Sequence, residues 1–142
     1  MSLTVVKRLS RNAASDECYT PCDQVLPILE YLDKDKTYYE ATSGISSQIV
    51  DGFKKYEYNI VPSNNKDFFQ CSPDDVHDGV ITNPPYSIKD NFIEHCYNIK
   101  KPFALFLPVA SMQGGKRGQM FMEYGMSCLV YNYRVDFTGG GS

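Results

Sequence analysis

The tetrapeptide Asn83-Pro84-Pro85-Tyr86 combines residue types that suit one kind of chemistry. The side-chain carbonyl of Asn83 and the backbone carbonyl of Pro84 can each accept a hydrogen bond from one planar amine, such as the exocyclic amine of adenine or a carboxamide nitrogen. Such a nitrogen is a weak nucleophile because its lone pair is delocalised, and two acceptors can direct that lone pair toward an electrophile. The prolines stiffen the segment by fixing φ at about −65°. Tyr86 adds a flat ring for stacking.

The position of this tetrapeptide favours a binding role. It follows the apolar run Gly79–Thr82 and precedes residues 88–97, whose apolar spacing predicts a helix. We therefore expect it at the carboxyl end of a strand, where open α/β sheets bind their ligands. The alternative interpretation is an ordinary turn at the end of a strand.

The rest of the chain alternates short apolar segments with segments of helical spacing, which predicts an α/β fold with a doubly wound, mostly parallel sheet. The apolar run 103–109 suggests a fully buried central strand, since parallel strands covered on both faces lose their alternation. Pro27 predicts an irregularity in the first helix. We expect strands at residues 37–42, 58–61, 67–69, 80–82, 103–109 and 129–135, and helices from residue 20, at 46–55 with Ile49, Val50 and Phe53 inward, after Tyr86, and at 117–124.

Size and charge limit the possibilities further. With 142 residues and 42% hydrophobic content the chain supports one core, and we divide it into a tail at 1–15, a domain at 16–138 and a glycine-rich tail at 139–142. Its 14 basic and 17 acidic residues give a net charge of −3, so any contact with nucleic acid must be local. Four cations are candidates for such a rim, although scattered cations also describe an ordinary solvated surface: Lys89, Lys116, Arg117 and Arg134.

Cysteine usage and the absence of targeting patterns indicate a soluble, cytoplasmic protein. Of the five cysteines only Cys18 and Cys22 are close in sequence, and no second Cys or His pair follows at zinc-site spacing. We therefore expect no metal site and interpret the cysteines as reduced thiols. The N-terminus lacks the apolar core of a signal peptide, and residues 103–110 are too few to span a bilayer, so no membrane partner is expected.

In their order, these segments resemble the class I S-adenosylmethionine-dependent methyltransferases of the amino-group type, closest to the compact N6-adenine DNA methyltransferases of phages and bacteria. The resemblance spans about residues 16–138, and only Asn83-Pro84-Pro85-Tyr86 is specific by itself. The chain departs from the family pattern at Ala41 and Ser46, where proline and glycine are usual, and it lacks the acid that binds the cofactor ribose. The remaining motifs are Tyr19-Thr20-Pro21, Glu40-Ala41-Thr42-Ser43-Gly44 and Asp67-Phe68.

The resemblance implies a Rossmann-like methyltransferase sheet that lacks its last strand, and S-adenosyl-L-methionine as cofactor. Tyr19, Thr20 and Pro21 would close over the methionine end of the cofactor, which Glu40 would orient, while Gly44 would allow close backbone approach. Asn64 is the nearest substitute for the ribose acid, Asp67 would accept from the cofactor adenine, and Phe68 would pack beside that ring. Asp67 as a turn cap and Phe68 as a core residue are equally open alternatives.

The expected reaction is methyl transfer to the N6 amine of adenine in DNA, with Asn83, Pro84, Pro85 and Tyr86 at the acceptor and no covalent enzyme intermediate. Three alternatives remain: an RNA adenine, a protein glutamine side chain, or a degenerate, non-catalytic fold that serves as a binding module. A last strand at 129–135 with no strand after it also predicts an exposed sheet edge and a homodimer.

Overall fold

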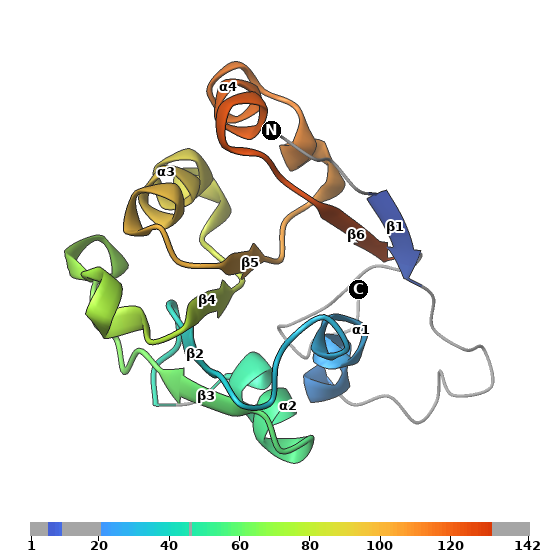
Figure 1. Cartoon of the computed structure of the whole chain (residues 1–142), viewed down its shortest axis with the longest axis vertical. Coiled ribbons are helices and arrows are strands. Elements are labelled where there is room, and N and C mark those ends of the chain that lie inside the picture. The colour runs from blue at the N-terminus through green and yellow to red at the C-terminus, as the bar shows by residue number, and fades with distance from the viewer. Residues whose placement is uncertain (1–5, 10–20, 46, 132–142) are drawn as a thin grey trace.

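The computed structural model describes residues 6–9, 21–45 and 47–131. Its centre is a four-stranded, all-parallel sheet in the order β3-β2-β4-β5 (Figure 1). A second, two-stranded parallel sheet pairs β1 with β6. The strands are β1 (Val6–Leu9), β2 (Thr37–Glu40), β3 (Asn59–Pro62), β4 (Gly79–Thr82), β5 (Phe103–Leu105) and β6 (Cys128–Tyr131).

Helices connect these strands in the alternation that the sequence predicts. Pro27 lies in the first turn of α1, where its missing N–H leaves no hydrogen bond unmade, so the irregularity expected there is the change from 3-10 to α-helix. The α-helices are α1 (Leu26–Leu29), α2 (Gln48–Lys55), α3 (Lys89–Ile99) and α4 (Gly115–Tyr124). The 3-10 helices are η2 (Pro21–Val25), η3 (Phe68–Gln70), η4 (Pro73–Val76), η5 (Tyr86–Ile88) and η6 (Val109–Met112).

Each face of the four-stranded sheet carries its own hydrophobic core. Tyr38 and Ile81 pack on one face with Val25, Ile49, Val50 and Phe53 of η2 and α2. Their neighbours Tyr39 and Val80 point to the other face, where η3, η4 and α3 supply Phe68, Val76, Phe92 and Cys96. Because successive strand residues alternate between faces, helices must cover both. The expected α/β fold with a parallel sheet is confirmed, and so are the inward positions of Ile49, Val50 and Phe53.

The strand order reverses between β2 and β4. From β2 the chain passes through α2 to β3 on one side, and then returns to place β4 on the other side of β2. The connections that leave the carboxyl ends of β2 and β4 therefore run in opposite directions along the sheet. Open α/β sheets form a ligand crevice at such a point. Thr42 follows β2 and Asn83 follows β4 at this point.

Two of the strand predictions are wrong. Residues 67–69 belong to a 3-10 turn, because the Asp67 carboxylate accepts a hydrogen bond from the backbone N of Phe69 (3.0 Å) and caps η3. The run 103–109 is not a buried central strand. β5 ends at Leu105, its residues are half-buried, and it is an edge strand of the four-stranded sheet. An apolar run cannot distinguish a strand covered by helices from one that lines an apolar groove.

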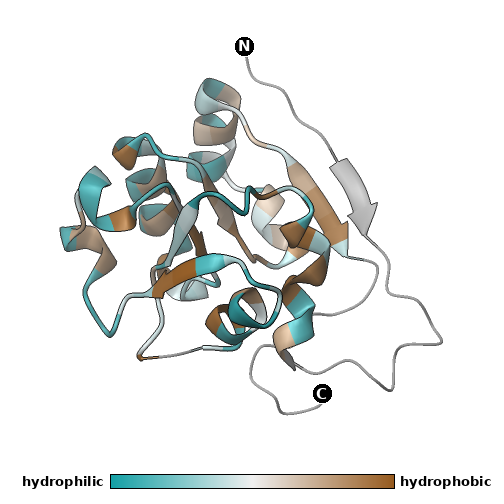
Figure 2. Ribbon diagram, turned by 60° about the horizontal axis from the view of Figure 1, so that its bottom comes forward, coloured by the Kyte–Doolittle hydropathy of each residue, from teal (hydrophilic) through white to brown (hydrophobic). Residues whose placement is uncertain are grey.

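The sequence predicts a last strand with an exposed edge, but in the structure β6 is paired with β1. β1 lies parallel to it with Val6 opposite Cys128 and Leu9 opposite Tyr131, so the expectation of an uncovered edge is wrong for β6 on this side. Figure 2 shows hydrophobic residues along β6. Residues 132–135, Arg134 and the glycine-rich segment 139–142 lie outside the described residues. None of the described helices is both long and apolar enough to cross a membrane.

Candidate functional site

The carboxyl ends of β2 and β4 are joined through one buried carboxylate. Glu40 is only 2% exposed. Its Oε1 accepts hydrogen bonds from the backbone N (3.0 Å) and the hydroxyl (3.2 Å) of Thr42, and a very short one from the hydroxyl of Thr82. Within the described residues no group donates to Oε2. The protein therefore uses one oxygen of Glu40 for three hydrogen bonds and the other for none that involves a described residue.

The Thr42 hydroxyl extends this link to the tetrapeptide. Its Oγ1 lies 2.7 Å from Thr82 Oγ1 and 3.2 Å from the backbone oxygen of Asn83. Sequence reasoning placed no role on Thr42 or Thr82. The available signal was their position, since one hydroxyl residue ends β4 directly before Asn83 and the other lies just beyond the end of β2.

Neither of the two oxygens proposed to hold an amine has a donor among the described residues. Asn83 Oδ1 is buried and finds no hydrogen-bond partner there, a costly state for a carbonyl oxygen. The backbone oxygen of Pro84 accepts no hydrogen bond from the described residues either. Pro85 and Tyr86 are exposed, and the Lys89 Nζ donates to the Tyr86 carbonyl (3.2 Å). Partial burial raises the pKa of the Tyr86 phenol above its ordinary value of 10.0, which already keeps the phenol neutral at physiological pH.

The tetrapeptide lines a large groove that continues between β5 and β6. The groove has a volume of about 1680 Å³, above the about 300 to 1000 Å³ usual for a small-molecule site, so it has room for a flat ring together with part of the molecule that carries it. Its walls are mostly apolar or aromatic. Lys101 is the one charged side chain among the described residues that line it.

The loops that follow β2 and β3 are hydrogen-bonded to each other. The backbone N of Asn64 donates to the Gly44 carbonyl (2.9 Å), and that of Asn65 donates to the Ser43 carbonyl (3.0 Å). Both asparagines have left-handed backbones, with φ of 53° and 66°, which Asn tolerates better than most residues. The Asn64 side chain is exposed. A Cβ on Gly44 would make only an ordinary contact with Asn65 (3.5 Å), so packing within the described protein does not require glycine there.

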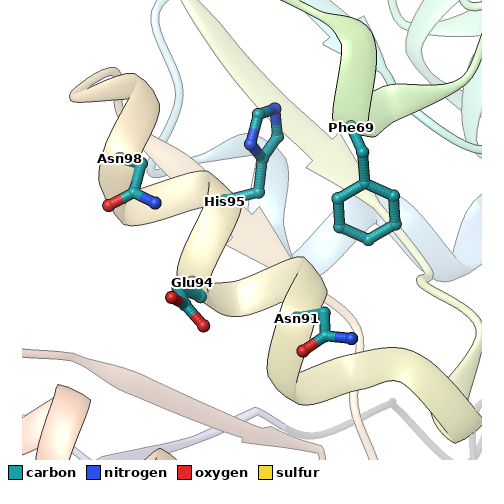
Figure 3. A pocket seen from close by; sticks show the side chains of 5 residues that line it. All are labelled: Phe69, Asn91, Glu94, His95 and Asn98. Atoms are coloured by element: carbon teal, nitrogen blue, oxygen red, sulfur yellow. The ribbon is translucent and has the colours of Figure 1, made fainter.

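The two residues proposed near the cofactor adenine occupy different environments. Asp67 is exposed, and one of its carboxylate oxygens caps η3. Phe68 is 3% exposed and stacks on Phe92 with ring centroids 4.3 Å apart, so in this arrangement its ring belongs to the core. Phe69 is the phenylalanine at the surface, and it borders a shallow pocket of about 330 Å³ on the outer side of α3 (Figure 3). The α3 residues lining that pocket are Asn91, Glu94, His95 and Asn98.

The basic residues of α4 are neutralised by acids of α3. Lys116 pairs with Glu94 (2.7 Å) and Arg117 with Asp90 (2.7 Å), and Arg117 is only 14% exposed. Arg117 is therefore poorly placed to neutralise phosphates, whereas the pair between Lys116 and Glu94 is exposed to solvent. Tyr19 and Thr20 lie outside the described residues, and of Pro21 only its place at the start of η2 is described. Among the residues that the structure describes, no cluster of His, Cys, Asp or Glu could hold a metal ion.

Comparison with known proteins adds no relative. No protein-family model matches the chain, and neither the curated proteins nor the solved structures contain a match.

Proposed function

We propose that this protein transfers a methyl group from S-adenosyl-L-methionine to the exocyclic N6 amine of adenine in DNA. The observation that carries the proposal is the unpartnered, buried oxygen of Asn83 at the reversal point of the sheet. A buried carbonyl without a donor destabilises the protein by about 1 to 3 kcal/mol, and an arriving N–H group would remove that cost. The unpaired carbonyl of Pro84, the next residue along the chain, offers a second acceptor for the same amine.

The described residues fit the cofactor in their chemistry. Glu40 Oε2, which has no donor within the described residues, suits the ammonium of the methionine end. The exposed amide of Asn64 suits the ribose hydroxyls, and the Asp67 oxygen that is not used in capping suits the adenine amino group. When bound, the cofactor supplies an electrophilic methyl group on a sulfonium. Asn64 in place of an acid gives a weaker hydrogen bond, so we expect micromolar affinity or poorer.

Residues of the protein, and not the cofactor, would hold the acceptor in place. Asn83 and Pro84 accept the two N–H groups, which directs the nitrogen lone pair toward the methyl group, while Tyr86 stacks on the ring. The stiff Pro84-Pro85 segment limits the entropy lost when the acceptor binds. No strong general base is needed, because the amine becomes acidic only as its new bond to carbon forms, and the proton can then leave to water.

A protein carboxamide is the second candidate acceptor, and the charges of the site favour it. Lys89 beside the tetrapeptide donates to the Tyr86 carbonyl (3.2 Å), and the cations of α4 pair with acids. Lys101, the one described cation that lines the groove, precedes β5 at the end of the sheet away from Asn83 and donates to the His77 carbonyl (2.8 Å). Binding to a DNA backbone depends on cations that are free to replace counterions. A glutamine side chain presents the same planar N–H₂ group to Asn83 and needs no phosphate contacts.

Both acceptors can be tested with a methyl-labelled cofactor. The parent protein is incubated separately with unmethylated DNA, with RNA and with polypeptides that contain glutamine, and label in each acceptor is counted. Label in DNA adenine supports the first candidate, and label in glutamine supports the second. A thermal shift without label in any acceptor supports the binding module instead. Absence of both label and thermal shift at millimolar cofactor would contradict the proposed function.

A further inference from the structure

We propose that Thr42 and Thr82 are positioning residues that couple the charge on Glu40 to the geometry of the acceptor segment. This inference rests on the proposed function, because it assigns Glu40 Oε2 to a cationic ligand and Asn83 to the acceptor. It goes beyond that function, because it gives a role to two hydroxyl groups that contact neither ligand.

The inference starts from the number of protons available to the two hydroxyl groups. The Thr82 hydroxyl has one proton and donates it to Glu40 Oε1. Thr42 must then be the donor in its 2.7 Å contact with Thr82. The same Thr42 proton also lies within reach of Glu40 Oε1 and of the Asn83 backbone oxygen, each 3.2 Å from Thr42 Oγ1. Three oxygens therefore compete for one proton.

Charge decides this competition. Glu40 is 2% exposed, so its negative charge is weakly screened and attracts the Thr42 proton strongly. A cation at Oε2 balances that charge and weakens the attraction of Oε1. The Thr42 proton, which the Asn83 carbonyl shares only part of the time in the free protein, then turns fully toward that carbonyl. It thereby fixes the peptide that joins Asn83 to Pro84, the two residues that carry the acceptor oxygens. Occupancy near the end of β2 thereby orders the segment after β4, and by linkage an acceptor bound at Asn83 strengthens cation binding equally.

The location of this network at the strand reversal supports a coupling role. Thr82 is fully buried, and Thr42 is exposed beside the tetrapeptide, so the two hydroxyls lead from the core to the groove. Plain stabilisation of Glu40 would require only donors to the carboxylate. It would not require the additional contact of Thr42 with the Asn83 carbonyl.

Hydrogen exchange can test the coupling without any activity. The Ile88 amide donates to the Pro85 carbonyl (3.2 Å) and reports the order of the acceptor segment. In Thr42→Val, which keeps the shape and removes the hydroxyl, we expect this amide to exchange about two- to tenfold faster than in the parent, the range that corresponds to one lost hydrogen bond. Thr42→Ser should restore the parent rate. Ile81→Val, a buried change on the opposite face of β4, controls for general destabilisation.

A second arm adds S-adenosylmethionine. In the parent, the cofactor should slow exchange of the Ile88 amide. It should have no such effect in Thr42→Val and Thr82→Val, which lack a hydroxyl. It should slow exchange again in Thr42→Ser and Thr82→Ser, which keep one. Unchanged ligand-free exchange in Thr42→Val would overturn the inference even if the parent binds no cofactor. A parent that binds no cofactor would instead refute the proposed function, while faster exchange in Thr42→Val would still support the hydroxyl link. Equal slowing by cofactor in the parent and in both valine variants would refute the coupling.

Discussion

Gly52 of α2 lies directly against the backbone of Cys22 in η2. A Cβ built on Gly52 would stand 2.2 Å from the Cys22 carbonyl oxygen and 2.6 Å from the Val25 side chain, closer than such atoms can approach. The close contact lets the Asp23 carboxylate reach both the Lys55 Nζ and the Tyr56 hydroxyl, each at 2.6 Å. These contacts fix η2, which precedes β2 in the chain, to α2, which follows β2.

We therefore expect Gly52→Ala to destabilise the protein by about 1 to 3 kcal/mol, because η2 must move away from α2. Gly118→Ala is the matched control, since nothing lies within 4 Å of a Cβ there. Because Gly118 is inside α4, that change should stabilise the protein by about 0.5 to 1 kcal/mol. Urea unfolding measures both, and equal effects of the two substitutions would contradict the close contact.

Asn83→Ala should remove methyl transfer and leave the protein as stable as the parent or more stable. The substitution deletes a buried oxygen that has no partner, so it removes a cost of about 1 to 3 kcal/mol that offsets the lost packing. Activity and stability then change in opposite directions, as expected for a group kept for binding. Thermal unfolding with and without cofactor measures the second effect. A marked loss of stability would show that Asn83 has a structural role.

Phe68→Ala and Phe69→Ala should differ strongly. Phe68 is 3% exposed and stacks on Phe92, so its truncation should cost about 3 to 5 kcal/mol. Phe69 is 37% exposed and contacts the rings of Phe92 (5.9 Å) and His95 (5.7 Å), so its truncation should cost less, about 1 to 2 kcal/mol. Calorimetric titration of the folded Phe69 variant with S-adenosylmethionine then tests whether the exposed ring contributes to cofactor binding.

Alkaline pH should destabilise the fold, because a buried thiol and a buried phenol lose their protons more readily in the unfolded chain. Burial raises the pKa of the Cys96 thiol from its ordinary value of 9.0 to about 12, and burial beside Cys71 also raises the pKa of Tyr39. The unfolded chain therefore loses these protons at lower pH than the folded protein. The stabilisation is complete below pH 9 and is lost as the pH rises toward 12.

The contribution of Cys96 can be isolated by substitution. Cys96→Ala should reduce the fall in unfolding free energy by up to about 1.4 kcal/mol per pH unit above pH 9, which corresponds to one proton. Unfolding in urea at several pH values between 8 and 11 measures this slope. Identical slopes in the variant and the parent would mean that the Cys96 thiol titrates normally in the folded protein.

Local patterns in the sequence were sufficient to predict most of the described fold. The spacing of Ile49, Val50 and Phe53 correctly predicted the inner face of α2, since one side of a surface helix must be apolar. The apolar run Gly79–Thr82 predicted a strand at residues 80–82, and the structure has β4 there with all of its residues buried. These signals arise from neighbours within one element, so they are visible without knowledge of the rest of the chain.

Features that depend on distant partners could not be predicted. Nothing near Glu40 in the sequence indicates that its carboxylate accepts from Thr82, a residue 42 positions away. Asp67 shows that a local contact can also stay undecided, since a residue two positions before Phe69 is compatible with a strand end, a cap or a ligand. The pairing of β1 with β6 is the extreme case, because it joins the two ends of the described chain.

That pairing also constrains the order in which the protein can fold during synthesis. β1 is made before the other described elements, and its partner β6 is made only after the whole four-stranded sheet. Until then the backbone N–H and C=O groups of β1 that face β6 have no strand to bond, which is the state in which strands join other chains. Closing such a long loop is also slow. Slower translation before residue 128 would extend this vulnerable period, whereas a chaperone that binds the N-terminal segment would protect the nascent chain.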